Sequence, residues 1–117
     1  MKTKQLGNSD LEVSVVGVGC MMFGSMCDQD TTTAIIDAAI DEGVNFFDTA
    51  DIYGKSEEFV GKALGDRRKD IILTTKFGAQ SGGKGGSIEG GGTRDYIMSA
   101  VEKRLSALGT DYLDLYQ

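Results

Sequence analysis

The sequence predicts an α/β fold built from parallel βα repeats, with a single domain over residues 1–117. Short apolar runs of strand length alternate with longer segments in which apolar residues recur at helical spacing. Strict alternation of this kind implies parallel strands joined by right-handed crossovers. A chain of 117 residues is the usual size for one hydrophobic core, so we expect no second module.

The strands are predicted from short runs that are rich in β-branched and aromatic residues and mostly bounded by Gly or Asp. These runs are residues 13–19, 44–47, 71–75 and 112–116. Ahead of them, residues 4–6 and 11–13 flank the turn-forming segment 7–10, which predicts an N-terminal β-hairpin. The expected order is therefore a hairpin followed by β-α-β-α-β-α-β.

Three helices are predicted between these strands. The first covers about residues 31–42, the second begins at Ser56 and stops at Gly65, and the third runs from Thr93 to Gly109. Asp28 and Asp30 are candidate N-caps of the first helix, and Gly43 closes it. The third helix has one apolar face, formed by Ile97, Val101, Leu105 and Leu108.

A glycine-rich segment, residues 78–92, is inserted between the third main strand and the third helix, and it is predicted to be a mobile loop. Eight of its fifteen residues are glycine, so it cannot build a core. Its first part, from Gly78 to Gly85, is similar to a phosphate-binding loop. Gly85 stands where that loop needs Ser or Thr, and the next helix begins only at Thr93, so nucleotide hydrolysis is not expected.

Composition excludes several classes of function. The formal net charge is −6 and the longest basic run is a triplet, which argues against nucleic acid or an anionic membrane as partner. No apolar stretch approaches the roughly 20 residues that a membrane helix needs, and no secretory leader is apparent, so we expect a cytoplasmic protein.

The absence of histidine and the spacing of the cysteines exclude further kinds of catalytic and metal site. The sequence contains no histidine, which excludes His-based triads, His-ligated zinc and a His general acid, and we expect no metal site. The two cysteines, Cys20 and Cys27, have neither redox-motif nor zinc-knuckle spacing. They are interpreted as reduced thiols that pack in the interior or line a pocket, rather than as redox groups.

Three ionisable residues follow predicted strand ends, where parallel βα folds collect functional groups. Asp48 and Lys76 end the second and third main strands, and Tyr53 lies in the loop after Asp48. If those strands are neighbours, about 4.8 Å apart, the three side chains can meet at one edge of the sheet. A lysine ammonium favours the phenolate of a nearby tyrosine, and a carboxylate keeps the lysine charged. Together they would form a general acid that protonates a carbonyl oxygen as hydride arrives at its carbon.

Position alone leaves a structural interpretation of the same three residues open. Asp48 would cap a turn, Tyr53 would pack on its loop, and Lys76 would be a solvated strand end. Since Asp, Tyr and Lys are common residues, their spacing does not choose between the two interpretations. The surrounding sequence does.

Several linked motifs closely resemble those of the aldo/keto reductase family. They are GVGCMMFG (residues 17–24), FDTADIYG (47–54), SEE (56–58), GKAL (61–64), TTKFG (74–78) and LGTDYLDLYQ (108–117). The likeness runs through nearly the whole chain in order, and only the glycine-rich segment is atypical. This resemblance implies a (β/α)₈ TIM-type barrel, of which the chain would be the N-terminal half.

The same resemblance implies NADPH-dependent reduction of small aldehydes and ketones, without a Rossmann domain. By resemblance, Tyr53 would be the proton donor, Lys76 would tune it, and Asp48 would pair with Lys76 near the nicotinamide ribose. Positions that border the nicotinamide and the substrate in the family correspond to Gly19, Cys20 and Met21. The implied cofactor-binding residues are therefore Asp48, Gly19, Cys20 and Met21. Simple packing in the pocket is the alternative for the last three.

Part of the family's machinery has no counterpart in this sequence. The family's fourth catalytic residue is a His two positions beyond the Gln that ends strand four, and here Gln117 is the last residue. The site for the adenosine phosphate and the loops that set substrate specificity belong to the second half of the barrel. The chain is therefore interpreted as truncated. The alternative function is a non-catalytic half-barrel that self-associates through its open sheet edges.

Overall fold

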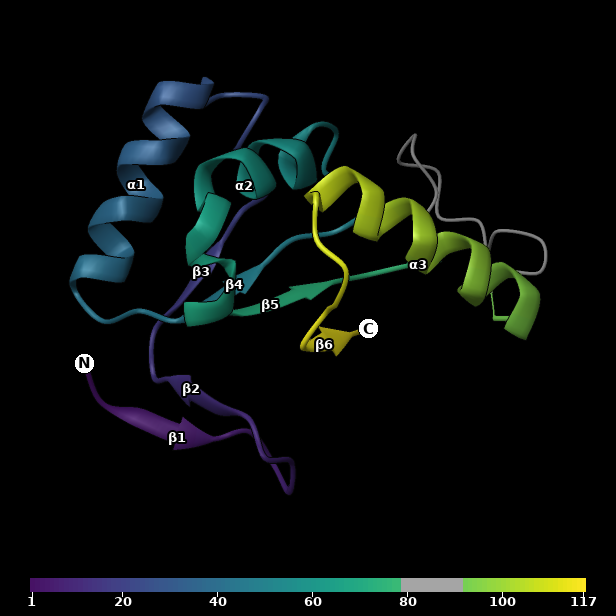
Figure 1. The fold of residues 1–117 in the computed structure, drawn as a ribbon, viewed down its shortest axis with the longest axis horizontal. Helices are drawn as coiled ribbons and strands as arrows, with labels where there is room; N and C mark the ends of the chain where they lie inside the picture. Colours follow the sequence, from purple (N-terminus) through teal and green to yellow (C-terminus); the bar gives the residue numbers. More distant parts are fainter. Residues whose placement is uncertain (79–91) are drawn as a thin grey trace.

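The computed structural model describes residues 1–78 and 92–117 and shows a four-stranded parallel sheet connected by helices (Figure 1). The strands are β3 (Gly17–Gly19), β4 (Phe46–Asp48), β5 (Ile72–Thr75) and β6 (Leu115–Tyr116), in that order across the sheet. The helices are α1 (Gln29–Asp41), α2 (Ser56–Leu64), the short 3₁₀ helix η1 (Gly65–Asp70) and α3 (Arg94–Leu108). Each neighbouring pair of strands is parallel, which confirms the predicted α/β class.

The predicted N-terminal hairpin forms a separate two-stranded sheet below the main one in Figure 1. β1 (Thr3–Gln5) pairs antiparallel with β2 (Glu12–Ser14). Asn45, just before β4, joins the hairpin to the main sheet: its Oδ1 accepts from Ser14 N–H at 2.7 Å, and its Nδ2 donates to the Glu12 carbonyl at 3.0 Å. The hairpin therefore lies at the amino ends of the parallel strands, away from their carboxyl ends.

Residues 13–19 do not form the single strand that was predicted. Val13 and Ser14 belong to β2, and the main sheet begins only at Gly17. β2 pairs antiparallel with β1 while β3 pairs parallel with β4, so the chain must bend between them. The Ser14 hydroxyl closes this bend by donating to the Val16 carbonyl at 2.6 Å.

The last predicted strand, residues 112–116, is shortened to β6 for a similar local reason. Opposite Leu73, the carboxylate of Asp114 accepts the Leu73 N–H at 2.8 Å, while Asp114 N–H donates to the Leu73 carbonyl at 3.2 Å. A side chain thus replaces one backbone partner of the ladder, and regular pairing starts only at Leu115.

The helix ends agree closely with the predicted capping. Of the two candidate caps, Asp28 caps α1, whereas Asp30 lies inside its first turn. The Asp28 carboxylate accepts from Thr31 N–H at 2.8 Å, and hydrogen bonds with the backbone and side chain of Thr31 lower the pKa of Asp28. Thr93 caps α3, and Gly109 ends it in the left-handed conformation, with φ of 63°. On the predicted apolar face of α3, Leu108 is buried and the other three residues are half-buried.

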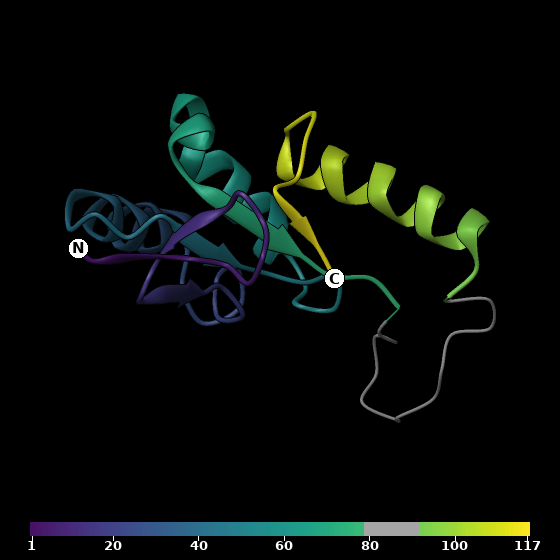
Figure 2. The same cartoon turned by 90° about the horizontal axis from the view of Figure 1, so that it is seen from below.

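The hydrophobic core lies between the sheet and its helices. α2 packs between α1 and α3, and Figure 2 shows α2 and α3 rising on one side of the sheet. Phe47 and Leu73 point into this layer from the two central strands, where they meet Ile36, Val60 and Leu108. Because strand residues alternate between faces, the residues next to Phe47 and Leu73 face the opposite, open side of the sheet.

The segment 78–92, predicted to be a mobile loop, lies outside the described residues except for its two end positions. Within residues 1–78 and 92–117, no helix combines the length and apolar character needed to cross a bilayer.

Candidate active site

The structure brings Asp48 and Lys76 together at the carboxyl ends of two neighbouring strands. Asp48 is the last residue of β4, and Lys76 follows β5 directly. Lys76 Nζ donates to Asp48 Oδ1 at 2.7 Å and to Oδ2 at 2.6 Å, and to the Thr49 carbonyl at 2.9 Å. The ammonium is therefore held by three acceptors that all belong to the end of β4.

Strand register explains why this pair meets. Asp48 lies opposite Thr74 in the β4–β5 ladder, and Lys76 is two residues beyond Thr74. Residues two apart in a strand point to the same face, so the Lys76 side chain lies on the same face of the sheet as Thr74. Lys76 can therefore reach back to Asp48, which lies opposite Thr74. This is the face opposite Phe47 and Leu73, which are in the core.

Tyr53 lies beside the ion pair, in the loop between β4 and α2. Lys76 Nζ is 5.3 Å from the centroid of the Tyr53 ring, a cation–π distance. The loop is held by a hydrogen bond from Tyr53 N–H to the Ala50 carbonyl at 3.2 Å. The side chains of Lys76 and Asp48 are 30% and 36% exposed, so the group lies at an accessible rim rather than in the core.

The last residue of the chain also reaches this group. Gln117 Nε2 donates to Thr74 Oγ1 at 2.6 Å and lies 3.4 Å from Asp48 Oδ1. The sequence interpretation used Gln117 only to mark the end of the fourth main strand. The structure places its amide on the same open face as Asp48, where it adds a donor beside the carboxylate.

Two hollows include residues of the candidate site. One, of about 620 Å³, is lined by residues of the N-terminal hairpin and the bend after it as well as by β3 and β4, and it includes Gly19 and Asp48. A Cβ built at Gly19 would meet no atom within 4 Å, so the backbone there faces open space. The other hollow, of about 510 Å³, includes Met21, Ile52 and Tyr53. Gly19 and Met21, both predicted to border a cofactor, thus line two different hollows, one with Asp48 and the other with Tyr53.

Cys20, predicted with them, is placed differently. Its side chain is fully enclosed in the core, and its N–H donates to the Asp48 carbonyl at 2.8 Å. Burial, with a smaller contribution from the Asp48 charge, raises the pKa of the Cys20 thiol to about 12. The thiol is therefore protonated and unreactive at neutral pH. Cys20 and the half-buried Cys27 are both free thiols.

The sequence interpretation did not predict that Glu57 is buried on the helix side of the sheet, where it contacts β5 and α3. Glu57 was assigned only to the first turn of α2, where acidic residues favour the helix dipole, but it is 5% exposed. Its carboxylate contacts Thr75 and Arg104. Alternation along β5 could have indicated the first contact, because the neighbour of Lys76 must face the helices.

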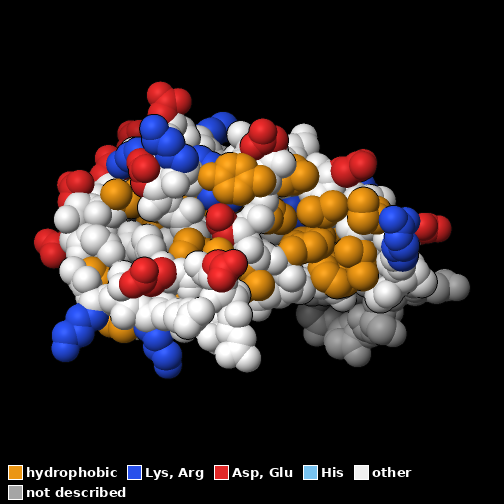
Figure 3. All heavy atoms as spheres, turned by 60° about the horizontal axis from the view of Figure 1, so that its bottom comes forward, with side chains coloured by type: hydrophobic (Ala, Val, Ile, Leu, Met, Phe, Trp, Pro, Cys, Tyr) orange, Lys and Arg blue, Asp and Glu red, His pale blue; other side chains and the backbone are white. Residues whose placement is uncertain are grey.

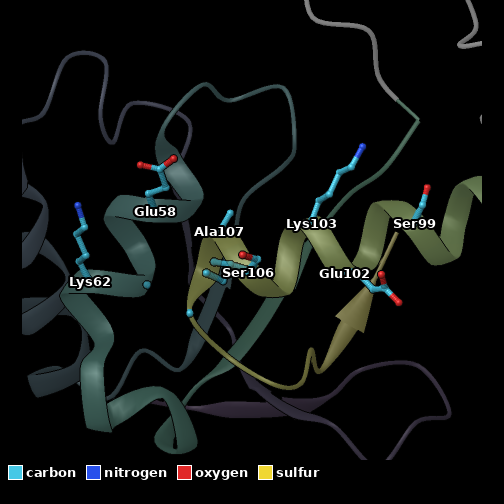
Figure 4. Close-up of a pocket in the computed structure, with 10 residues that line it drawn as sticks. Glu58, Lys62, Ser99, Glu102, Lys103, Ser106 and Ala107 are labelled. Atoms are coloured by element: carbon cyan, nitrogen blue, oxygen red, sulfur yellow. The ribbon is translucent and has the colours of Figure 1, made fainter.

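A groove of about 910 Å³ between α2 and α3 is not the candidate site, although it is larger than either hollow (Figure 4). Its lining comes from the two helices and the glycine that ends α3, and it carries exposed charged side chains such as Glu58, Lys62 and Lys103. Asp48, Tyr53 and Lys76 do not take part in it. The candidate catalytic residues lie at the carboxyl ends of the strands instead.

The parallel βα sheet places an aspartate, a tyrosine and a lysine at the carboxyl ends of its strands, which is where βα barrel proteins collect their functional groups. The family model described as "Aldo/keto reductase family" matches residues 15–117. The chain therefore belongs to the aldo/keto reductase family, as its motifs indicated.

Individual relatives agree with this assignment. The chain is 46% identical to "Uncharacterized oxidoreductase YqkF" of Bacillus subtilis, over 100% of this chain and 38% of that protein. It is 35% identical to "Aldo-keto reductase yakc [NADP(+)]" of Schizosaccharomyces pombe, over 97% of this chain and 35% of that protein. The holo form of aldo-keto reductase AKR11C1 from Bacillus halodurans superposes with a TM-score of 0.87 at 48% identity, covering 100% of this chain and 39% of the other. The chain thus spans well under half the length of the relatives it matches.

Proposed function

We propose that this chain carries the proton-donating part of an NADPH-dependent reductase that converts aldehydes and ketones to alcohols. The observation that carries the proposal is the Lys76 ammonium, bonded to both Asp48 oxygens and placed over the Tyr53 ring. The three residues lie within residues 15–117, which match the aldo/keto reductase family model.

Residues at the sheet edge suit a nicotinamide cofactor. The Asp48 carboxylate, 36% exposed, can accept hydrogen bonds from ribose hydroxyls, and the open backbone at Gly19 leaves room for a flat ring. NADPH is proposed over NADH because the Schizosaccharomyces pombe relative is named for NADP(+). When bound, the cofactor supplies the hydride that the carbonyl carbon receives.

The chain's own residues would then manage the proton. Tyr53 Oη donates a proton to the carbonyl oxygen as negative charge develops there. The Lys76 ammonium would attract the negative charge left on Tyr53 Oη, and Asp48 orients the ammonium through two hydrogen bonds. Met21 and Ile52, which share a hollow with Tyr53, would shield the reacting carbonyl from water.

A direct assay tests this proposal on the 117-residue chain. At high protein concentration, with NADPH and an aromatic aldehyde, we expect absorbance at 340 nm to fall and the corresponding alcohol to form. Lys76→Met should slow this reaction strongly, whereas Lys62→Met, which changes an exposed lysine of α2, should leave the rate unchanged. NADH should support a slower reaction. Absence of alcohol formation by the unaltered chain would overturn the proposal.

A second candidate function, self-association, is favoured by the open sheet edges. Within the described residues, β3 pairs only with β4, and β6 only with β5. Hydrophobic side chains gather on the α3 side of the face shown in Figure 3, and Val15 and Val16, just before β3, are more than half exposed. Unpaired edges and exposed apolar surface both favour association between copies.

Sedimentation over a range of concentrations tests this second proposal. We expect a mass above that of the monomer that rises with concentration, and we expect Val16→Lys to reduce it by placing a charge beside the open edge. A monomer at every concentration would contradict the proposal.

A further inference from the structure

Two adjacent residues at the start of α2, Ser56 and Glu57, tie the Tyr53 loop to the strand ends. Ser56 N–H donates to the Tyr53 carbonyl at 3.1 Å, so the loop closes directly onto this residue. The Ser56 hydroxyl donates to the Cys20 carbonyl at 2.7 Å and lies 2.9 Å from Thr49 Oγ1. Ser56 is fully buried, and it therefore fixes the loop against the ends of β3 and β4.

Glu57 makes the corresponding link to β5. Its Oε1 accepts from Thr75 Oγ1 at 2.7 Å, and its Oε2 lies 3.3 Å from Arg104 Nε on α3. Glu57 is 5% exposed and Thr75 is fully buried, so water does not compete for this hydrogen bond. Thr75 immediately precedes Lys76, so the bond anchors the backbone from which the Lys76 side chain extends.

We propose that Glu57 is a positioning residue that sets the Lys76 ammonium against the Tyr53 ring through its hydrogen bond with Thr75. Glu57 is four residues after Tyr53, and its bond partner is one residue before Lys76. The two side chains of the proposed acid are thus joined through one short, buried connection. The inference rests on the proposed function in taking Tyr53 and Lys76 as that acid.

The electrostatics of the position allow a conservative variant. Burial raises the pKa of Glu57, opposed by the Thr75 hydroxyl and the Arg104 charge and assisted by the Asp51 charge. Glu57→Gln keeps an acceptor for Thr75 and removes the charge, which separates positioning by the hydrogen bond from the ion pair with Arg104.

Fluorine NMR of the chain labelled with 3-fluorotyrosine tests the proposal without requiring turnover. The fluorine resonance of Tyr53 is assigned by its loss in the Tyr53→Phe variant. The Lys76→Met variant then shows how far this resonance shifts when the ammonium is removed. Glu57→Leu is expected to shift this resonance in the same direction and by a comparable amount, because Lys76 leaves its place over the ring. Glu57→Gln is expected to keep the resonance near its original position.

A matched control separates positioning from stability. Val60→Ala removes buried side-chain volume from the same helix and lowers the melting temperature, but it should leave the Tyr53 resonance in place. If Glu57→Leu does not fold, Thr75→Val removes only the hydroxyl donor and should give the same shift. An unmoved resonance in the folded Glu57→Leu or Thr75→Val protein, or an equal shift in Val60→Ala, would overturn the inference. Failure of the aldehyde assay alone would overturn the proposed function but not the inference about Glu57.

Discussion

Tyr53→Phe is expected to lower the rate of carbonyl reduction by about 10²–10⁴-fold, the range usual for loss of a general acid. Phenylalanine keeps the ring, and therefore keeps the surface on which the Lys76 ammonium lies at 5.3 Å. Only the hydroxyl that supplies the proton is lost. Because a proton donor acts mainly in the transition state, kcat should fall while KM changes little.

Steady-state kinetics with NADPH and an aromatic aldehyde measure this effect, and Tyr112→Phe is the matched control. Tyr112 is 41% exposed, and its hydroxyl makes a long hydrogen bond of 3.4 Å to the Arg68 carbonyl. The Tyr112 variant should react at the original rate. Equal rates for the Tyr53 variant and the unaltered chain would mean that another group donates the proton.

Gly61→Ala is expected to destabilise the fold by about 3 kcal/mol, the upper part of the range for overpacking a tight contact. A Cβ at Gly61 would overlap the Leu108 carbonyl oxygen and would lie 2.7 Å from the carbonyl carbon. Both are backbone atoms, so the end of α3 would have to move away from α2. At an exposed helix position the same change would stabilise by about 0.5–1 kcal/mol, so the sign of the effect is diagnostic.

Urea denaturation measures this difference, with Lys62→Ala as the control. Lys62 is the next residue along α2 and is exposed, so its replacement should change the free energy of unfolding by no more than about 0.5 kcal/mol. If Gly61→Ala were as stable as the unaltered protein, α2 and α3 could not approach as closely as the structure shows.

Sequence reasoning predicted those parts of the fold that depend on local signals. The order of elements, the N-terminal hairpin, the Asp28 cap and the glycine that ends α3 were all indicated by residue type and spacing. Predicted strands were wrong where a tertiary contact decided their extent. The bend after Ser14 and the Asp114 side chain opposite Leu73 depend on pairing with distant segments, which spacing within a run does not reveal.

In the candidate site too, features set by local sequence could be predicted and features set by tertiary contacts could not. Asp48 and Lys76 could be placed at one edge because parallel strands of similar length end together. The link between Glu57 and Thr75 could not be predicted, since an acidic residue in a first helical turn is usually solvated. Nor does any local pattern show that Gly61 touches Leu108, because that contact depends on how two helices pack.

A double-mutant cycle on the reduction rate, combining Tyr53→Phe with Lys76→Met, tests most directly whether the phenol and the ammonium act as one acid. If they do, the double variant should be scarcely slower than the slower single variant, because either change already removes the shared function. If the fold-reduction in rate of the double variant equals the product of the two single fold-reductions, Tyr53 and Lys76 contribute independently, and they do not act as one acid.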